Sequence, residues 1–184
     1  MSIIVTGVDI ETTGLNVNDG HRIIEIALDI HRFDGKKLTR VKTFNQHIDP
    51  QRGIDKGAQD IHGISYDMLK GSPTWDVVAP NIGRIIAATK VLVAHNADFD
   101  APFIGAELNR VKQPIPKCSV FCTMENGRFA TPLGKLPSLV ELCWACGVDF
   151  DETSAHAADY DIIKTMECLQ RGIDLGYYKL PIGD

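Results

Sequence analysis

The sequence contains no apolar run that approaches the roughly 20 residues a helix needs to span a bilayer. Its first residues, MSIIVTGVD, also lack the basic region followed by a long apolar stretch that marks a signal peptide. We therefore expect no membrane segment and a cytoplasmic, intracellular location. In that compartment the five cysteines are expected to be thiols rather than disulfides.

Positive charge is not in excess either. The chain has 19 Lys and Arg against 24 Asp and Glu, a formal net charge of −5 at pH 7. This disfavours binding of nucleic acid through bulk positive charge, although a small site in which metal ions meet phosphates stays compatible with it. Repeats, low-complexity tracts and linkers are absent as well, so the 184 residues predict a single domain over 1–184.

The first part of the chain is predicted to be rich in β-structure. Residues 3–10 and 22–33 have the composition of strands, and the Gly- and Asn-rich loop between them favours a hairpin over a helical crossover. The dipeptide Asp34-Gly35 is typical of a tight hairpin and should lead into a third strand around residues 38–48.

Helices and strands alternate in the rest of the chain. Ser72 and Pro73 are predicted as the N-cap and first residue of a helix that Pro80 should kink or break. The remaining pattern predicts a strand, a helix, a short strand and two helices at residues 90–94, 99–111, 117–122, 138–146 and 154–171, the last ended by Gly172. We therefore expect an α/β domain with a mixed sheet.

Two acids mark the end of the first predicted strand. Asp9 and Glu11 are two residues apart, so they share one face of the strand. Two adjacent carboxylates repel each other unless one is protonated or a cation lies between them. Oxygen ligands of this kind suit Mg²⁺ or Mn²⁺. The alternative is a pair of solvated acids.

The fourth predicted strand ends in a second polar group. Asp98 is interpreted as an N-cap of the next helix, and Asp100 falls in its first turn, where a carboxylate suits the helix dipole. His95 and Asn96 are candidate hydrogen-bonding residues at the strand end. Each of these residues alone has a structural explanation.

The last predicted helix opens with a histidine and an acid. His156 precedes Asp161 by nearly one and a half helical turns. A mobile histidine near an acid cluster is suited to activating a water molecule. Taken alone, His156 has the alternative role of a cap or surface residue.

The three groups, in this order, match the signatures of the DEDDh 3′–5′ exonucleases. The chain resembles that family in D-x-E-T-T-G-L at Asp9–Leu15, in H-N-A-x-F-D at His95–Asp100 and in H-x-x-x-x-D at His156–Asp161. Residues 61–64 and 20–26 are also similar to it, the second resembling the proofreading epsilon subunit of bacterial replicative polymerases. The resemblance implies a ribonuclease H-like fold, an α/β mixed five-stranded sheet whose first three strands are antiparallel.

The resemblance also implies catalytic roles. Asp9 would bridge two Mg²⁺ ions, with Mn²⁺ as the alternative metal. Glu11 and Asp161 would complete the tighter metal site, and Asp100 would hold the second ion. His156 would accept the proton of the attacking water as a general base.

Substrate contacts are expected around these acids. By resemblance, Thr12 and Gly14 would meet the 3′ end of the substrate, and Leu15 would pack on its terminal base. His62 and Asn96 are further candidates. For Leu15 the alternative is a loop residue that covers the core. Stacking of this kind has little sequence preference and fits splayed single strands.

Three readings of function remain open. The first is a metal-dependent 3′–5′ exonuclease acting on single-stranded DNA ends, with a polymerase or repair partner as an open question, since too few residues follow Asp161 for a long polymerase-binding tail. The second is an RNA trimmer similar to oligoribonuclease, with DNA favoured over RNA. The third is a non-catalytic binding module, which the complete set of acids disfavours.

Two further features have two interpretations each. Cysteines 118, 122, 143 and 146 have the spacing of a zinc site, but the apolar pattern around the second pair favours buried core thiols. The basic residues of the predicted hairpin could follow a nucleic-acid backbone, although protection of an edge strand by charge is favoured; they are Arg32, Lys36, Lys37, Arg40 and Lys42.

Overall fold

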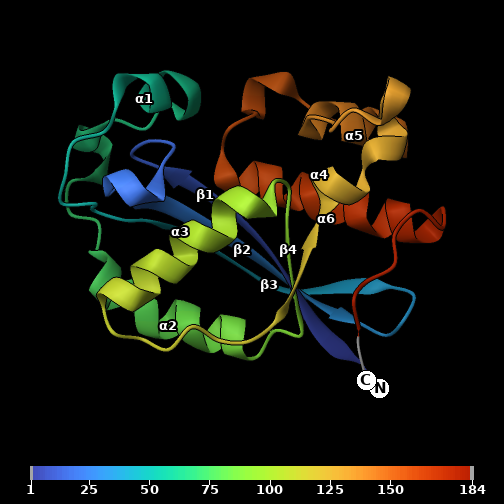
Figure 1. Ribbon diagram of the computed structural model, residues 1–184, viewed down its shortest axis with the longest axis horizontal. Helices are drawn as coiled ribbons and strands as arrows, with labels where there is room; N and C mark the ends of the chain where they lie inside the picture. Colours follow the sequence, from blue (N-terminus) through green and yellow to red (C-terminus); the bar gives the residue numbers. More distant parts are fainter. Residues whose placement is uncertain (1, 183–184) are drawn as a thin grey trace.

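The computed structural model describes residues 2–182 and is built on one five-stranded sheet in the order β3-β2-β1-β4-β5 (Figure 1). The first three strands are antiparallel, whereas β4 runs parallel to β1 and β5 parallel to β4. The mixed sheet expected from the sequence is therefore confirmed. The strands are β1 (Ile3–Thr12), β2 (Ile23–Phe33), β3 (Leu38–His47), β4 (Val91–Ala94) and β5 (Ser119–Cys122).

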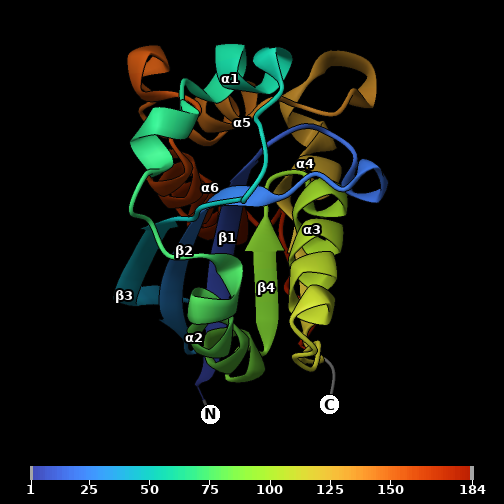
Figure 2. The same cartoon turned by 90° about the vertical axis from the view of Figure 1, so that its left-hand side faces the viewer.

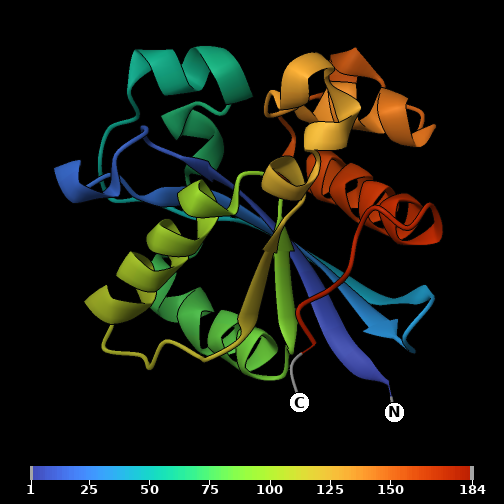
Figure 3. The same ribbon diagram turned by 45° about the vertical axis from the view of Figure 1, so that its right-hand side comes forward.

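Helices cover both faces of the sheet (Figure 2). On one face lie α2 (Trp75–Ala87) and α3 (Ala97–Arg110), and on the other lie α5 (Leu139–Cys146) and α6 (Ala158–Asp174). Two short helices, α1 (Lys56–His62) and α4 (Thr123–Asn126), complete the set of α-helices in residues 2–182. Both α1 and α5 stand beyond the end at which β4 finishes, with a gap between their ribbons (Figure 3). None of the helices in the described range is long and apolar enough to cross a membrane.

The predicted hairpin between β2 and β3 is confirmed. The carboxylate of Asp34 accepts hydrogen bonds from the N–H groups of Lys36, at 2.9 Å, and Lys37, at 2.8 Å. Gly35 has φ 104°, a conformation in which a side chain would be strained. Asp34 and Gly35, the two residues from which the hairpin was predicted, therefore stabilise the turn.

The prediction for α2 was wrong at its start. The N-cap is Thr74 rather than Ser72, so Pro73 lies before the helix. Pro80 does not break the helix, which continues to Ala87. Pro80 is exposed, and so is the residue four positions earlier, whose carbonyl group loses its N–H partner.

The prediction for α6 was wrong at both ends. The helix begins at Ala158, because residues 152–154 form a separate 3₁₀ turn capped by Asp151. It also continues past Gly172, which is buried against Tyr178. A Cβ on Gly172 would lie 2.2 Å from the ring of Tyr178, so this glycine serves packing rather than helix termination.

The strand β1 divides the core by the alternation of its side chains. Val8 and Ile10 pack with α2 and α3, and Val5 packs with α5 and α6. Gly7 faces α6 so closely that an added Cβ would be 2.6 Å from Cδ1 of Ile162. The side chains of odd-numbered residues in this strand therefore face α6.

The cysteines are core thiols, as the favoured interpretation predicted. Cys143 and Cys146 are buried on the α6 face, whereas Cys122 is buried on the α2 face. Cys143 Sγ lies 3.4 Å from the sulfur of Cys168. The two cysteine pairs considered for zinc are thus on opposite sides of the sheet, which excludes one site for all four.

The basic hairpin lies at the edge of the sheet, because β3 is an outer strand. Arg40 is not free to follow a nucleic-acid backbone, since it forms two hydrogen bonds of 2.8 Å with the buried carboxylate of Asp29. His31 also contacts that carboxylate at 2.9 Å. The edge-strand interpretation is therefore the better one.

Candidate active site

Two acids project from the end of β1 toward α6. Asp9 lies opposite Ala27 of β2, and Glu11 lies opposite Glu25. Asp9 and Glu11 lie two and four residues after Gly7, so their side chains are on the same face of the sheet as Gly7. The sequence prediction that Asp9 and Glu11 act on one point is consistent with this arrangement.

The third acid comes from the first turn of α6. The absence of a side chain at Gly7 lets α6 approach β1. Asp161 directly precedes Ile162, the residue of α6 that lies against Gly7. Asp161 Oδ2 accepts a hydrogen bond of 3.0 Å from the N–H of His156. Its other oxygen, Oδ1, is buried without a hydrogen-bond partner in the described residues. A buried and unpaired carboxylate oxygen is unfavourable unless another group binds it.

The fourth acid is Asp100, in the first turn of α3. It is buried, and the backbone N–H groups of Asp100 itself and of Ile10 in β1 lower its pKa against the larger, raising effect of burial. The N-cap of α3 is Asn96 rather than Asp98, which is exposed in the first turn. His95 bonds to Thr123 Oγ1 at 3.0 Å, so its predicted role as a strand-end hydrogen-bonding residue is confirmed.

The four acids interact electrostatically. Burial raises the pKa of Asp9 well above its ordinary range, and the charges of Asp100, Glu11 and Asp161 raise it further. Burial, followed by the charge of Glu25, raises the pKa of Glu11 to about 8. Burial also raises the pKa of Asp100 and of Asp161. Strands and helices far apart in the sequence thus bring the predicted acids together.

The donor set fits hard divalent cations. It consists of buried carboxylate oxygens whose charges raise the pKa of Asp9 and of Glu11, and it includes the unpaired Oδ1 of Asp161. Mg²⁺ and Mn²⁺ prefer such ligands. Within residues 2–182, no three His, Cys, Asp or Glu side chains are arranged so that they could hold a metal ion as they stand. The argument for cations therefore depends on the chemistry of these donors.

Sequence analysis missed Glu25. This side chain is buried opposite Glu11, and it bonds to Asn45 Nδ2 at 3.0 Å and contacts His47 Nε2 at 3.3 Å. Both partners lie on β3. The register of β2 against β1 would have revealed Glu25, but the long loop between these strands does not fix that register.

His156 lies in the loop before α6 and is exposed. Its φ of 64° is unusual for a residue with a side chain. A hollow of about 360 Å³ is lined by His156 and Asp161, together with residues of α5 and of the segment before α6: Ser138, Leu139, Val140, Phe150, Glu152 and Ala155. The structure therefore places the predicted histidine beside one of the acids.

A second hollow of about 220 Å³ contains most of the predicted substrate contacts. Leu15 is 77% exposed there, so the alternative in which it covers the core is wrong. Gly14 is buried and does not line the hollow. The lining residues are Glu11, Thr12, Leu15, Ala58, Ile61, His62, Asn96 and Phe99.

Three lining residues were not predicted as contacts. Ala58 and Ile61 belong to α1, a helix that buries no side chain and therefore has no apolar pattern in the sequence. Phe99 lies where the helix over residues 99–111 was predicted to begin, and it is half-buried. Its position three residues after Asn96, one helical turn, was the signal that could have placed it in the hollow.

His62 is fixed in this hollow by both ring nitrogens. Nδ1 accepts a hydrogen bond of 3.0 Å from the N–H of Ile64. Nε2 must then carry the hydrogen that bonds to the carbonyl oxygen of Thr12, at 3.2 Å. Burial lowers the pKa of His62, and the nearby charge of His156 lowers it further. The two histidines therefore lie near each other at the site.

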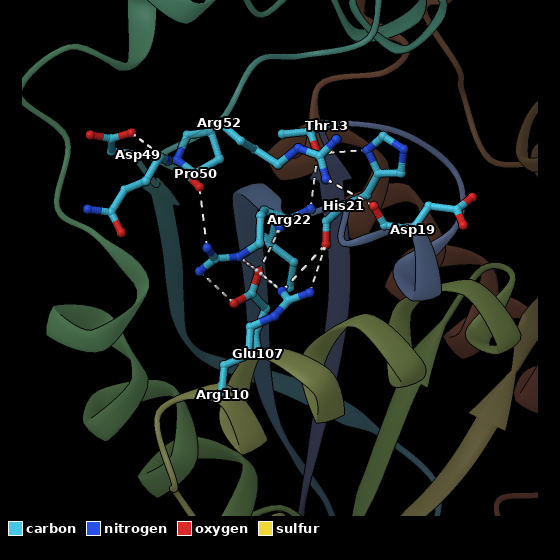
Figure 4. Close-up of polar contacts among 11 residues, drawn as sticks. Thr13, Asp19, His21, Arg22, Asp49, Pro50, Arg52, Glu107 and Arg110 are labelled. Atoms are coloured by element: carbon cyan, nitrogen blue, oxygen red, sulfur yellow. Dashed lines mark hydrogen bonds and ion pairs between the residues drawn. The ribbon is translucent and has the colours of Figure 1, made fainter.

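The loop after β1 is supported by a buried ion-pair network (Figure 4). Glu107 of α3 is fully buried and accepts hydrogen bonds from Arg22 Nε, at 2.6 Å, and Nη2, at 3.0 Å. Arg110 approaches the same carboxylate at 3.0 Å. The network fixes the start of β2, and with it one end of the loop.

The chain is similar to known exonucleases. A family model described as Exonuclease (RNase_T) matches residues 6–169. DNA polymerase III subunit epsilon of Escherichia coli (strain K12) is 35% identical over 162 residues, which is 83% of this chain and 64% of that protein. The chain thus spans less than two thirds of the length of this relative.

Solved structures give the same result. Exonuclease X in complex with 5′ overhanging duplex DNA is 26% identical, with a TM-score of 0.70 over 95% of this chain and 94% of the other. A zinc-bound complex of E. coli ExoI with single-stranded DNA has a TM-score of 0.80 at 18% identity, over 95% of this chain and 41% of the other. The second comparison supports the fold alone and agrees with the predicted ribonuclease H-like class.

Proposed function

Because the chain belongs to the exonuclease (RNase_T) family, we propose that it removes nucleoside monophosphates from the 3′ ends of single-stranded DNA, in the 3′–5′ direction. The observation that carries the proposal is the convergence of four acids from β1, α3 and α6, in which burial and the charges of Asp100, Glu11 and Asp161 raise the pKa of Asp9. We treat residues 1–184 as one exonuclease domain within this proposal.

The four acids would hold two Mg²⁺ ions, with Mn²⁺ as the alternative. Divalent cations bound there would neutralise the acids and the scissile phosphate and would make a bound water more acidic. The charges of the other three acids all raise the pKa of Asp9, so Asp9 would suit the role of a ligand shared by both ions. Asp161 keeps Oδ1 available, while its Oδ2 holds the loop that carries His156.

His156 would accept the proton of the attacking water. Its backbone N–H is bonded to Asp161, so the residue is tied to the acid cluster. Its ring has no hydrogen bond to the rest of the described chain and borders the hollow beside Asp161. A neutral imidazole in that place can take up a proton and release it to solvent after each cleavage.

The hollow beside Glu11 would hold the terminal nucleotide. Leu15, Ile61 and Phe99 offer apolar surface for a base, and Asn96 offers an amide, because its side chain does not cap α3. Apolar contact with a base does not depend on its identity, so little sequence preference is expected. Glu11 lines the same hollow, which would put the terminal phosphodiester next to the acids.

Two other functions compete with this one, and a polymerase partner is considered with them. An exoribonuclease similar to oligoribonuclease would use the same acids and differ in contacts to the 2′-hydroxyl group. A polymerase partner is proposed from the epsilon subunits, which are 35% identical to this chain. A non-catalytic binding module is disfavoured, because all four acids and His156 are present.

The test is digestion of one oligonucleotide sequence made as DNA and as RNA, labelled at the 3′ or the 5′ end. Wild-type protein is incubated with Mg²⁺ or with EDTA beside the Asp9→Ala variant. We expect metal-dependent shortening from the 3′ end that the variant lacks, and faster cleavage of DNA. Equal cleavage by the variant would assign the activity to a contaminant, and faster cleavage of RNA would select the exoribonuclease.

A further inference from the structure

His21 lies buried between the loop that follows β1 and the start of α1. It is 7% exposed. Its Nδ1 forms a hydrogen bond of 3.0 Å with Thr13 Oγ1, drawn in Figure 4. Its Nε2 lies 3.5 Å from Oδ2 of Asp55, the residue that precedes α1. One ring thus touches two segments that are about 40 residues apart in the sequence.

The hydrogen positions on this ring follow from its neighbours. Thr13 Oγ1 accepts the N–H of Arg22 at 3.0 Å, and Thr13 is fully buried. The hydroxyl hydrogen of Thr13 needs an acceptor, and Nδ1 of His21 is in reach. In the neutral ring, Nε2 therefore carries the hydrogen, and the carboxylate of Asp55 lies 3.5 Å from this nitrogen.

The ring also packs directly on the loop backbone. A Cβ on Gly14 would lie 2.3 Å from Cε1 and 2.5 Å from Nδ1 of His21. Real side-chain carbons do not approach this closely, so the contact requires glycine at residue 14. Gly14, predicted from the sequence as a substrate contact, thus has a packing role next to the exposed Leu15.

The two segments joined by His21 both line the hollow beside Glu11, which is called the nucleotide hollow below. Thr12 and Leu15 line it from the β1 loop, and Ala58 and Ile61 line it from α1. α1 buries none of its side chains, so packing in the core does not hold it in place. The segments that flank α1 pack in a small apolar cluster with β2, and polar contacts hold the ends of the helix itself.

Those end contacts all lead to the same loop. At the start of α1, the N–H of Asp55 bonds to the carbonyl oxygen of Thr13 at 2.9 Å. At its end, His62 Nε2 bonds to the carbonyl oxygen of Thr12 at 3.2 Å. His21 adds the only ion pair between side chains across this boundary in the described residues.

We propose that His21 is a positioning residue, which sets the separation between the β1 loop and α1 and thereby the fit of the terminal nucleotide. This inference rests on the proposed exonuclease function. His21 does not line the hollow, so it acts through Gly14 and Asp55 rather than by touching substrate.

The first test measures α1 without metal or nucleic acid. Hydrogen exchange of the amides of residues 59–63 is compared between wild type and His21→Ala. We expect exchange to become about tenfold faster in the variant, because local opening of α1 becomes easier. His31→Ala is the matched control, since His31 is also 7% exposed and also contacts an aspartate, Asp29, at 2.9 Å.

The second test separates positioning from stability. For single-nucleotide release from a single-stranded DNA oligonucleotide with Mg²⁺, His21→Ala should raise KM about tenfold and change kcat less than about threefold. His21→Gln can still reach Asp55 with its amide and should recover part of the KM effect. His31→Ala should leave KM unchanged at a temperature where all variants are folded.

The outcomes are distinct. Unchanged exchange in α1 of His21→Ala overturns the inference, and so does faster exchange with unchanged KM. An equal rise of KM in His31→Ala assigns the effect to general destabilisation and also overturns it. If the wild-type protein cleaves no oligonucleotide while exchange in α1 responds to His21→Ala, the proposed function fails and the contact between the loop and α1 stands.

Discussion

Glu11 of β1 lies directly opposite Glu25 of β2, and the two carboxylates face the same side of the sheet. Asn45 and His47 bond to Glu25, so it is held in place from β3. Glu11 has no such partner in the described residues. Burial and the charge of Glu25 together raise the pKa of Glu11 to about 8.

This pair predicts an unusual dependence of stability on pH. Without metal, folded Glu11 keeps its proton up to about pH 8, whereas the unfolded chain loses it near pH 4.5. The folded state binds more protons in that range, so the free energy of unfolding should fall by about 5 kcal/mol as pH rises from 4.5 to 8. Thermal denaturation in EDTA, followed by circular dichroism, measures it.

Addition of Mg²⁺ should reverse this fall, because the cation favours the ionised acids. The increase in Tm on adding Mg²⁺ should therefore be larger at pH 8 than at pH 5. Glu25→Gln should weaken the pH dependence, and Asp98→Asn, which removes an exposed acid of α3, should not alter it. Stability that rises with pH in EDTA contradicts the assignment.

A second prediction concerns the general base. His156→Asn should slow cleavage by about 10²–10⁴-fold, because the proton acceptor is lost. Asparagine is chosen because it tolerates the left-handed backbone at φ 64° better than alanine does. Single-turnover cleavage with saturating Mg²⁺ gives the rate. An undiminished rate removes His156 from the mechanism.

Metal binding provides the comparison for that variant. His156→Asn should retain the affinity for Mn²⁺, measured by titration calorimetry, since only its backbone N–H contacts an acid. Asp161→Asn should lower the affinity instead, because it removes a carboxylate that has one unpaired oxygen. Equal affinity in both variants would exclude Asp161 as a ligand.

A third prediction tests the approach of α6 to β1. Gly7→Ala should destabilise the protein by about 1–3 kcal/mol, because its methyl group meets Ile162 and Met166. Displacement of α6 should also move Asp161 and lower kcat at least about tenfold. Gly83→Ala is the control: nothing lies within 4 Å of a Cβ there, and alanine in α2 should stabilise slightly. Similar effects of both changes on kcat would contradict the role of Gly7.

A fourth prediction concerns the nucleotide hollow. Phe99→Ala should weaken binding of single-stranded DNA by about 1–3 kcal/mol, the usual range for stacking of a base on an aromatic ring. Leu15→Ala should weaken it as well, because apolar contact with the base is lost. Leu133→Ala is the control, because this leucine is fully exposed and does not line the hollow. KM for oligonucleotides that differ in the 3′-terminal base measures the effect. A loss confined to one base would show sequence readout rather than stacking.

The strands and the four acids could be predicted because their signals are local. Apolar runs end at Asp9 and at Ala94, and short signatures surround the acids. Their meeting point could be inferred only from the order of those signatures. The close contact of Gly7 with Ile162 had no local signal, although it brings Asp161 to Asp9.

The remainder depended on tertiary contacts. α1 has no apolar face, so its two lining residues could not be recognised. Glycine is a residue type typical of a helix end, but Gly172 lies inside α6, where the ring of Tyr178 occupies the space that a side chain would need. Glu25 required the register between two strands joined by a long loop, and His21 required the position of Asp55 across the fold.

The alternation of Gly7, Asp9 and Glu11 along β1 has a consequence for insertions and deletions. Adding or removing one residue between Gly7 and Asp9 would turn both acids toward α2 and α3 and bring Val8 or Ile10 to the α6 face. Such a change leaves the composition of the strand almost intact and separates the acids from Asp161. Variation in the length of this strand should therefore be far less tolerated than substitution of its apolar residues.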